Sequence, residues 1–248
     1  MIKAAAAKIA GRSHVSTKTP CQDAVRTRNL RSKVCIALAD GAGSKKFSRT
    51  GANAVVRLAT HQCLEFFDRY HEGILRKKEG LESEIIDDFK AELAARARKR
   101  HRPIGDYACT LLFFACVGDR YIAGHIGDGA IFARFGERLV TLSEPENGEY
   151  TNTTFFVTDP DASNHLRLYA GHFDGSLDLM LLSDGTAESL LDRSTRQAGA
   201  GVSRLMDVFR DLTATQMTRV LKKNLELVLS LKSADDCSIA MTAVSRNG

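Results

Sequence analysis

Three apolar runs of this chain end in aspartate followed by glycine. These pairs, together with two aspartates at the borders of other apolar runs, are Asp40-Gly41, Asp128-Gly129, Asp184-Gly185, Asp23 and Asp236. Aspartates at strand ends can converge from distant parts of a chain, and oxygen donors without a His/Cys cluster favour Mg²⁺ or Mn²⁺ over zinc. Carboxylates gathered at one place repel one another unless cations offset their charge. The pattern therefore indicates a site for two divalent cations about 3.5–4 Å apart, which can activate water for attack on a phosphoryl group.

Asp-Gly is also the strongest two-residue signal for a β-hairpin. For Asp128 the hairpin stays open as an alternative, because residues 130–135 could form the returning strand. For Asp40 and Asp184 the alternative is weaker, since a helical pattern follows each of them, from Ser48 and from Thr186 onward.

The strands and helices that would position these aspartates do not alternate regularly along the chain. Short apolar runs bounded by polar residues or glycine predict buried strands over 34–39, 108–117, 121–126, 177–182 and 237–244. Apolar residues at three- and four-residue steps predict helices over 48–70 and 82–99, and two helices within 203–231 that break near Thr213. Two helices follow one strand, then strands come in succession, then helices and a last strand. This order favours an α+β fold with mixed or antiparallel sheets over a doubly wound parallel sheet.

Length and composition fit an enzyme-sized globular protein, which we expect to fold as one domain over residues 1–248. The net charge of +5 is mild and there is no Trp, so neither nucleic-acid binding nor a base-stacking surface is expected. No stretch approaches the roughly 18 apolar residues that span a bilayer, so we expect no membrane association. The six cysteines fall at irregular intervals without a C-x-x-C pair, which predicts free thiols in a reduced, cytoplasmic protein.

Six segments, in the same order along nearly the whole chain, resemble those of the PP2C-type (PPM family) metal-dependent protein serine/threonine phosphatases, in particular their compact bacterial branch. They are residues 11–14 with 21–24, then 39–44, 105–110, 125–129, 181–185 and 235–239. The resemblance implies a four-layer α-β-β-α sandwich of two mostly antiparallel sheets flanked by helices, with metals in a cleft at one end. It also implies a strand over residues 4–7, where the propensity of alanine alone would give a helix.

The resemblance implies a function and a set of ligands as well. The function is hydrolysis of phosphoserine and phosphothreonine in proteins by a hydroxide that bridges two Mn²⁺ or Mg²⁺ ions, without a phosphoenzyme. Carried over by position, Asp40 would bridge the two metals and the Gly41 carbonyl would bind one of them. Asp184 would complete the site from the other sheet, Asp23 would hold metal-bound water, and Asp128 would help to bind a third, looser metal.

The remaining ligand falls on a pair of adjacent aspartates. The resemblance assigns it to Asp236 rather than Asp235, because the family's ligand directly precedes a polar position that we place at Cys237.

Two family positions are occupied differently here. Ala42 stands where many members have a histidine proposed as general acid, and Lys18 stands where many have a phosphate-binding arginine. Lysine is a point charge that cannot make the bidentate fork of arginine. We therefore count His14 and Lys18 among the catalytic candidates and Arg12 as a candidate for substrate binding. For His14, the alternative is a polar residue at a strand end.

Two polar segments have open roles. Residues 147–152 lie where the family places a variable flap, so Glu149 and Asn152 are candidates to contact substrate, with an ordinary polar loop as the alternative. Residues 96–102 contain five permanent cations near a helix end. Such cations at the solvent-exposed C-terminal end of a helix offset the negative end of the helix dipole. The alternatives are recruitment of an acidic phosphoprotein and contact with nucleic acid.

The expected partner is a phosphoprotein, the target of a Ser/Thr kinase, and the expected state is a monomer. One alternative is a catalytically weak, phosphoprotein-binding regulator of the same fold, which the missing histidine and arginine would explain. Another is a two-metal nuclease, which would need a nucleic-acid groove formed with residues 96–102.

Overall fold

The computed structural model describes residues 1–146, 154–192, 195, 197–229 and 233–245. The ten strands of the described residues form two five-stranded sheets, in which all neighbouring strands are antiparallel. The first sheet has the order β1 (Ile2–Ile9), β10 (Cys237–Ser245), β9 (Ser176–Leu182), β6 (Ala130–Phe135) and β7 (Arg138–Ser143). The second has the order β2 (Ala24–Leu30), β3 (Lys33–Ala39), β4 (Leu111–Val117), β5 (Arg120–Ile126) and β8 (Arg167–His172).

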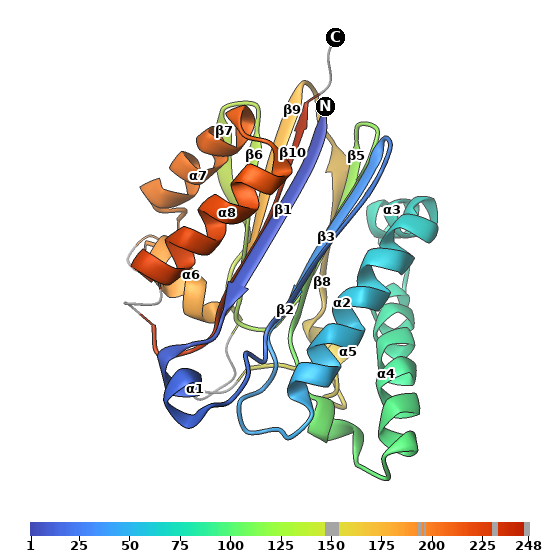
Figure 1. The fold of residues 1–248 in the computed structure, drawn as a ribbon. Coiled ribbons are helices and arrows are strands. Elements are labelled where there is room, and N and C mark those ends of the chain that lie inside the picture. The colour runs from blue at the N-terminus through green and yellow to red at the C-terminus, as the bar shows by residue number, and fades with distance from the viewer. Residues whose placement is uncertain (147–153, 193–194, 196, 230–232, 246–248) are drawn as a thin grey trace.

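Helices cover the outer face of each sheet (Figure 1). The second sheet packs against α2 (Ser48–Glu65), α3 (Phe67–Leu75) and α4 (Leu81–Lys99), and the first against α6 (Asp184–Leu190), α7 (Ala200–Asp211) and α8 (Ala214–Asn224). The shorter elements are α1 (Arg12–Thr17), η1 (Ile104–Tyr107), α5 (Ala162–His165) and η2 (Leu225–Leu229). The expected four-layer α-β-β-α sandwich is thus confirmed.

Strand β3 shows why its continuous apolar sequence forms a central strand. Val34, Ile36 and Leu38 face the core between the two sheets. Cys35, Ala37 and Ala39, which alternate with them, face the helices on the other side. Because both faces of the strand are covered, alternate residues are buried in two different cores. The strand therefore does not need to alternate polar with apolar residues.

The predicted breaks between helices are partly confirmed. The apolar pattern over 48–70 forms two helices rather than one, because the chain leaves helical geometry at Phe66, where φ is −105° and ψ is 24°. The break near Thr213 is confirmed. Thr213 caps α8, with its hydroxyl accepting a hydrogen bond from the Gln216 amide at 3.3 Å while the Gln216 side chain accepts one from the Thr213 amide at 2.9 Å.

The hairpin alternative for Asp128 is wrong. Strand β5 belongs to the second sheet and β6 to the first, so the segment between them crosses from sheet to sheet. Gly127 makes this crossing with φ at +119°, and a Cβ atom there would lie 2.5 Å from Cγ2 of Thr110. The strand predicted over 108–117 is also shorter, because it begins only at Leu111.

Strands from both ends of the described chain share the first sheet. The alanine-rich segment forms β1, as the resemblance implied, and pairs with β10 from Ile2–Val244 to Ile9–Cys237. Helix α1 and strands β2, β7 and β8 were not predicted. No helix among the described residues is both long enough and apolar enough to cross a membrane.

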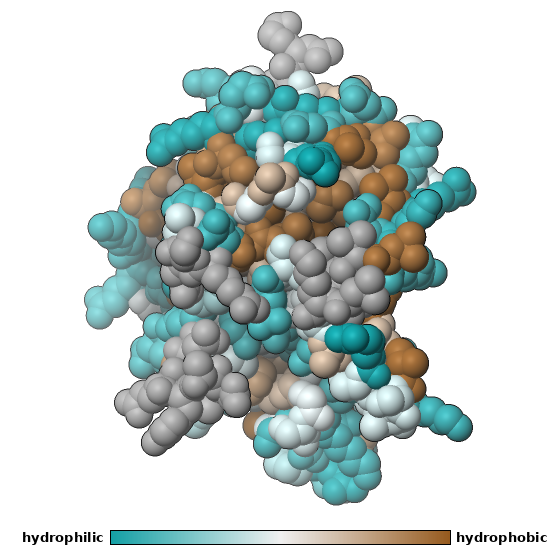
Figure 2. Space-filling model, turned by 90° about the vertical axis from the view of Figure 1, so that its left-hand side faces the viewer, coloured by the Kyte–Doolittle hydropathy of each residue, from teal (hydrophilic) through white to brown (hydrophobic). Residues whose placement is uncertain are grey.

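Figure 2 turns the side that carries α6, α7 and α8 towards the viewer. Hydrophobic side chains gather in the upper part of this face, whereas the lower end, near which α1 lies in Figure 1, is mainly hydrophilic. The hydrophilic end is the one at which the aspartates predicted from the sequence come together.

Candidate metal centre

The predicted aspartates stand at the same end of the sandwich because neighbouring strands run antiparallel. Asp23 precedes β2 and Asp40 follows β3, and the two strands are paired through Ala24 and Ala39. Asp184 follows β9, whose last residue Leu182 pairs with Ile239, near the start of β10. The carboxyl end of one strand therefore lies beside the amino end of the next.

Asp128, in the segment that crosses between the sheets, and the pair Asp235 and Asp236 before β10 lie at the same end of the sandwich. Asp128 lies between β5 and β6, two residues before Ala130, which also pairs with Leu182. Asp235 and Asp236 directly precede β10. We call Asp23, Asp40, Asp128, Asp184 and Asp235 the aspartate cluster, because the electrostatics described next connects them.

Each of four carboxyl groups in the cluster is harder to ionise than an ordinary aspartate. Burial raises the pKa of Asp40 well above its usual range, and the charges of Asp23, Asp184 and Asp128 raise it further. Burial also raises the pKa of Asp128 to about 7, with Asp184 as the next cause and a smaller contribution from Asp235. These mutual effects mean that the carboxyl groups lie within short electrostatic range of one another.

Asp23 and Asp184 follow the same pattern. Burial raises the pKa of Asp23 to about 7, against the opposing effect of a hydrogen bond from Ser238. Burial is also the largest cause of the raised pKa of Asp184, and the charge of Asp235 adds to it. Hydrogen bonding between Asp40 and Asp184 raises the pKa of the first and lowers that of the second.

The backbone around the cluster is fixed by close contacts. The Asp40 amide donates to Oγ1 of Thr110 at 2.9 Å, and the Thr110 amide donates to the Asp40 carbonyl at 2.8 Å. A Cβ atom at Gly41 would lie 2.8 Å from the carbonyl oxygen of Gln22, so only glycine lets the two segments approach this closely. Lys8 donates to the Asp23 carbonyl at 2.5 Å. Sequence reasoning missed Thr110 and Lys8, for which it offered no local signal.

These residues fit a divalent-metal centre. Asp23 is fully buried, and although its Oδ2 accepts a hydrogen bond from Ser238 Oγ at 2.6 Å, its Oδ1 has no hydrogen-bond partner among the described residues. A buried carboxylate oxygen without a donor is costly. Cations, or water molecules that cations hold, would satisfy this atom and offset the repulsion that raises the four pKa values. The donors are oxygens, which suits Mg²⁺ or Mn²⁺.

The carboxylate of Asp236 is held by hydrogen bonds from the protein. Its Oδ1 accepts hydrogen bonds from the Gly11 amide at 2.8 Å and from Nδ1 of His14 at 2.9 Å, and its Oδ2 accepts one from the Gln22 amide at 2.6 Å. The side chain ties the start of α1 and the segment before β2 to β10, and the residue is only 1% exposed.

Asp235, by contrast, is exposed and contributes to the raised pKa values of Asp128 and Asp184. The geometry thus favours Asp235 over Asp236 as the acid that meets a cation. The sequence carries no signal for this choice, because both faces of β10 are buried and strand alternation therefore does not separate Asp235 from Asp236.

Of the candidates between β1 and β2, His14 comes closest to the cluster. It lies in α1, so the strand-end alternative is wrong, and ligand atoms of His14, Asp235 and Asp236 lie within 4.8 Å of one another. Arg12 is exposed, with its Nε donating to the Ser233 carbonyl at 3.4 Å. Lys18 is exposed at the end of α1 with φ at 58°, and its ammonium group forms no ion pair with any described residue. Glu149 and Asn152 lie outside the described residues.

A family model and a sequence relative indicate the same protein family for this chain. Residues 10–229 match the family model described as Protein phosphatase 2C. The chain is 30% identical over 169 residues to serine/threonine-protein phosphatase 3 of Escherichia coli (strain K12), which covers 66% of this chain, and it spans 65% of the length of that relative.

Solved structures share the fold. Serine/threonine phosphatase Stp1 from Staphylococcus aureus superimposes with a TM-score of 0.64 and 16% identity, over 99% of this chain and 96% of that one. The catalytic domain of serine threonine protein phosphatase PstP, in complex with two manganese ions, has a TM-score of 0.55 and 14% identity, over 99% of both chains.

Proposed function

Because the chain belongs to the protein phosphatase 2C family, we propose that it hydrolyses phosphoserine and phosphothreonine in proteins with the help of divalent cations. The observation that carries the proposal is the aspartate cluster, in which burial and mutual repulsion raise the pKa values of four carboxyl groups. A relative with 30% identity is named serine/threonine-protein phosphatase 3, and a neighbour of the same fold was solved in complex with two manganese ions, which supports the same hypothesis.

The proposed ligands come from both sheets. Asp40, the Gly41 carbonyl, Asp184 and Asp235 would hold two Mn²⁺ or Mg²⁺ ions, and Asp128 would take part in holding a third. When bound, the ions supply positive charge that lowers the pKa of water and polarises the phosphoryl oxygens. Asp235 replaces Asp236 in this set because all the described contacts of the Asp236 carboxylate are to protein donors.

Asp23 would orient the attacking water. Ser238 fixes its Oδ2, and its Oδ1, which has no hydrogen-bond partner among the described residues, would accept a hydrogen bond from that water.

His14 would supply the proton that the leaving oxygen needs. With the Asp236 carboxylate as acceptor, Nδ1 of His14 carries a proton and the ring is held in a fixed orientation, so Nε2 is the atom left for a substrate. This would replace the family's histidine at the position of Ala42. Arg12 and Lys18, both exposed cations on or next to α1, would bind the phosphate, and Glu149 and Asn152 would contact the substrate.

The proposal extends to the setting of the protein. We expect a monomer that acts in the cytoplasm on a target of a Ser/Thr kinase. All six cysteines are free thiols, and five of them are buried, which supports a reducing compartment.

Hydrolysis of a phosphoserine peptide tests the function directly. We expect release of phosphate with Mn²⁺ or Mg²⁺, no release in EDTA, recovery when the metal is restored, and loss of activity in Asp184→Asn. Full activity in chelator would overturn the proposal.

The departures at Ala42 and Lys18 favour a second candidate, a catalytically weak regulator that binds phosphoproteins. Mn²⁺ binding by calorimetry together with no turnover of a panel of phosphopeptides would support this second function over the first.

A further inference from the structure

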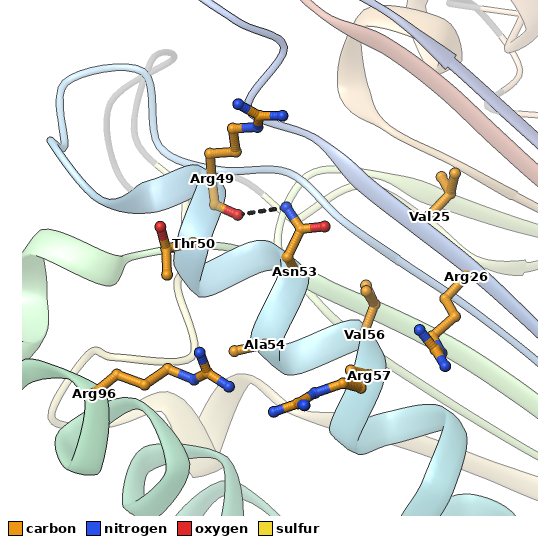
Figure 3. Close-up of a pocket in the computed structure, with 9 residues that line it drawn as sticks. All are labelled: Val25, Arg26, Arg49, Thr50, Asn53, Ala54, Val56, Arg57 and Arg96. Carbon is orange, nitrogen blue, oxygen red and sulfur yellow. Dashed lines mark hydrogen bonds between the residues drawn. The ribbon is translucent and has the colours of Figure 1, made fainter.

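The exposed face of α2 lies between β2 and α4 and is lined with arginines. Arg49, Asn53 and Arg57 follow one another at four-residue steps and are exposed. Figure 3 shows the hollow around this face, with Arg26 reaching from β2 on one side and Arg96 from α4 on the other. Its volume is about 510 Å³.

A second hollow, of about 430 Å³, shares Thr50, Arg57 and Arg96 with the first and continues along α4 to Lys99 and Arg100. We call the basic side chains of the two hollows the α2 basic surface. They are Arg26, Arg49, Arg57, Arg96, Lys99 and Arg100. Glu92 is the one acid that lines either hollow. The six basic side chains and the one acid give this surface an excess of five positive charges.

Glu92 neutralises little of this charge. Its Oε1 is shared between Arg57, at 3.2 Å, and Arg96, at 2.7 and 2.9 Å. Arg26 and Arg49 form no ion pair within the described part of the chain. Exposed guanidinium groups without a carboxylate partner are suited to bind carboxylates or phosphates through paired hydrogen bonds.

The α2 basic surface begins beside the metal centre. The backbone of Gly41 lies so close to the start of α2 that a Cβ atom on it would be 2.9 Å from the carbonyl carbon of Ser48. Arg49 is the next residue. From Arg49 to Arg57 the helix rises about 12 Å, a length that an extended peptide covers in about four residues.

We propose that the α2 basic surface binds acidic side chains that flank the phosphorylated residue of the substrate, roughly three to six positions away from it. This inference rests on the proposed function and adds a substrate preference to it. An acidic peptide fits better than single-stranded nucleic acid, because no aromatic side chain lines either hollow in the described part of the structure, and base stacking needs one.

Two matched phosphopeptides test the preference. One carries Asp and Glu at these flanking positions and the other Asn and Gln. We expect kcat/KM to be about tenfold higher for the acidic peptide at low ionic strength, and about equal for the two peptides near 0.5 M salt. In the double variant Arg49→Gln/Arg57→Gln the preference should fall to about twofold or less, while hydrolysis of p-nitrophenyl phosphate stays unchanged.

The matched control is Arg204→Gln/Arg219→Gln, which removes two exposed charges from α7 and α8 on the other side of the sandwich. It should keep the tenfold preference. Arg26→Gln, on β2, should lower the preference in the same direction as the α2 variant but by less. An unchanged preference in Arg49→Gln/Arg57→Gln would overturn the inference.

A binding measurement separates this inference from the proposed function. Fluorescence anisotropy of a labelled acidic peptide without phosphate needs no turnover, so it decides the question even if no phosphopeptide is hydrolysed. We expect a several-fold higher Kd for Arg49→Gln/Arg57→Gln than for the control. Equal Kd values would overturn the inference, as would tighter binding of a single-stranded oligonucleotide that the same double variant abolishes.

Discussion

Nδ1 of His14 lies 2.9 Å from Oδ1 of Asp236, a contact between residues 222 positions apart in the sequence. The same carboxylate accepts hydrogen bonds from the amides of Gly11 and Gln22. Asp236 therefore organises the segment that presents His14 beside the aspartate cluster. The adjacent Asp235 is exposed, and its Oδ1 accepts a hydrogen bond from the Asp236 amide at 2.8 Å.

Alanine substitutions at Asp235 and Asp236 should have different effects, one on metal binding and the other on the free energy of unfolding. Asp236→Ala leaves the buried Gly11 amide, the half-buried Gln22 amide and an imidazole without their acceptor, which should lower the free energy of unfolding by about 2–4 kcal/mol. Asp235→Ala removes an exposed side chain, so it should change stability by less than about 0.5 kcal/mol while weakening Mn²⁺ binding. Urea unfolding in EDTA and titration calorimetry with Mn²⁺ measure the two effects. Equal destabilisation by both variants would contradict the assignment.

His14→Gln should slow the hydrolysis of a phosphoserine peptide far more than that of p-nitrophenyl phosphate. The alkoxide of serine is a poor leaving group that needs a proton, whereas p-nitrophenolate leaves without one. A general acid contributes about 10²–10⁴-fold, so kcat for the peptide should fall within that range. A similar loss for both substrates would instead indicate a structural role for His14.

Asp184→Asn should stabilise the metal-free protein while it abolishes stabilisation by metal. The Asp184 charge raises the pKa values of Asp23, Asp40 and Asp128, so its removal at pH 8 should relieve repulsion by about 1 kcal/mol or more. Mn²⁺ should raise the Tm of the wild type by mass action, but not that of the variant. Thermal unfolding with and without EDTA tests both signs, and a less stable metal-free variant would count against a repulsive cluster.

The metal-free protein should lose stability as the pH rises towards neutrality. Burial, followed by neighbouring charge, raises the pKa of Asp128 from 3.8 to about 7. A carboxyl group with a higher pKa in the folded than in the unfolded state favours folding while it is protonated, and this advantage is lost as the pH rises from about 4 to about 7.

The difference in unfolding free energy between wild type and Asp128→Asn isolates the contribution of that group. It should fall over this interval by an amount on the order of 1–3 kcal/mol, since each pKa unit corresponds to about 1.4 kcal/mol. Saturating Mn²⁺ should flatten the dependence, because a cation stabilises the ionised form. A difference that rises with pH would contradict the raised pKa.

The sequence predicted the central strands and the long helices better than the edges of the fold. Strand β3 and helix α4 have strong apolar patterns, which local reasoning reads correctly. The edge strands β2 and β8 have exposed or half-buried polar residues, so their sequences lack that signal. For residues 4–7, local propensity gives the wrong element, because pairing with β10 decides the outcome.

In the candidate site too, residues with a local sequence signal were predicted, whereas features that depend on distant parts of the chain were not. Asp23, Asp40, Asp128 and Asp184 were predicted to converge, and the structure brings them together. The choice between Asp235 and Asp236 depends on three donors from residues 11–22, which are distant in the sequence. Likewise, the Asp128-Gly129 signal is local, whereas the path of the chain there depends on which sheet receives β6.

The pairing of β1 with β10 has a consequence for synthesis of the protein. β1 is made before the other described strands, yet its one ladder partner in the described sheets is made after all of them. At about 5–20 residues per second, the ribosome needs on the order of 10–50 s to deliver that partner. During this interval an unpaired strand would offer an edge to other nascent chains. The alanines of β1 prefer a helix intrinsically, so the strand conformation of this segment depends on a partner that arrives late.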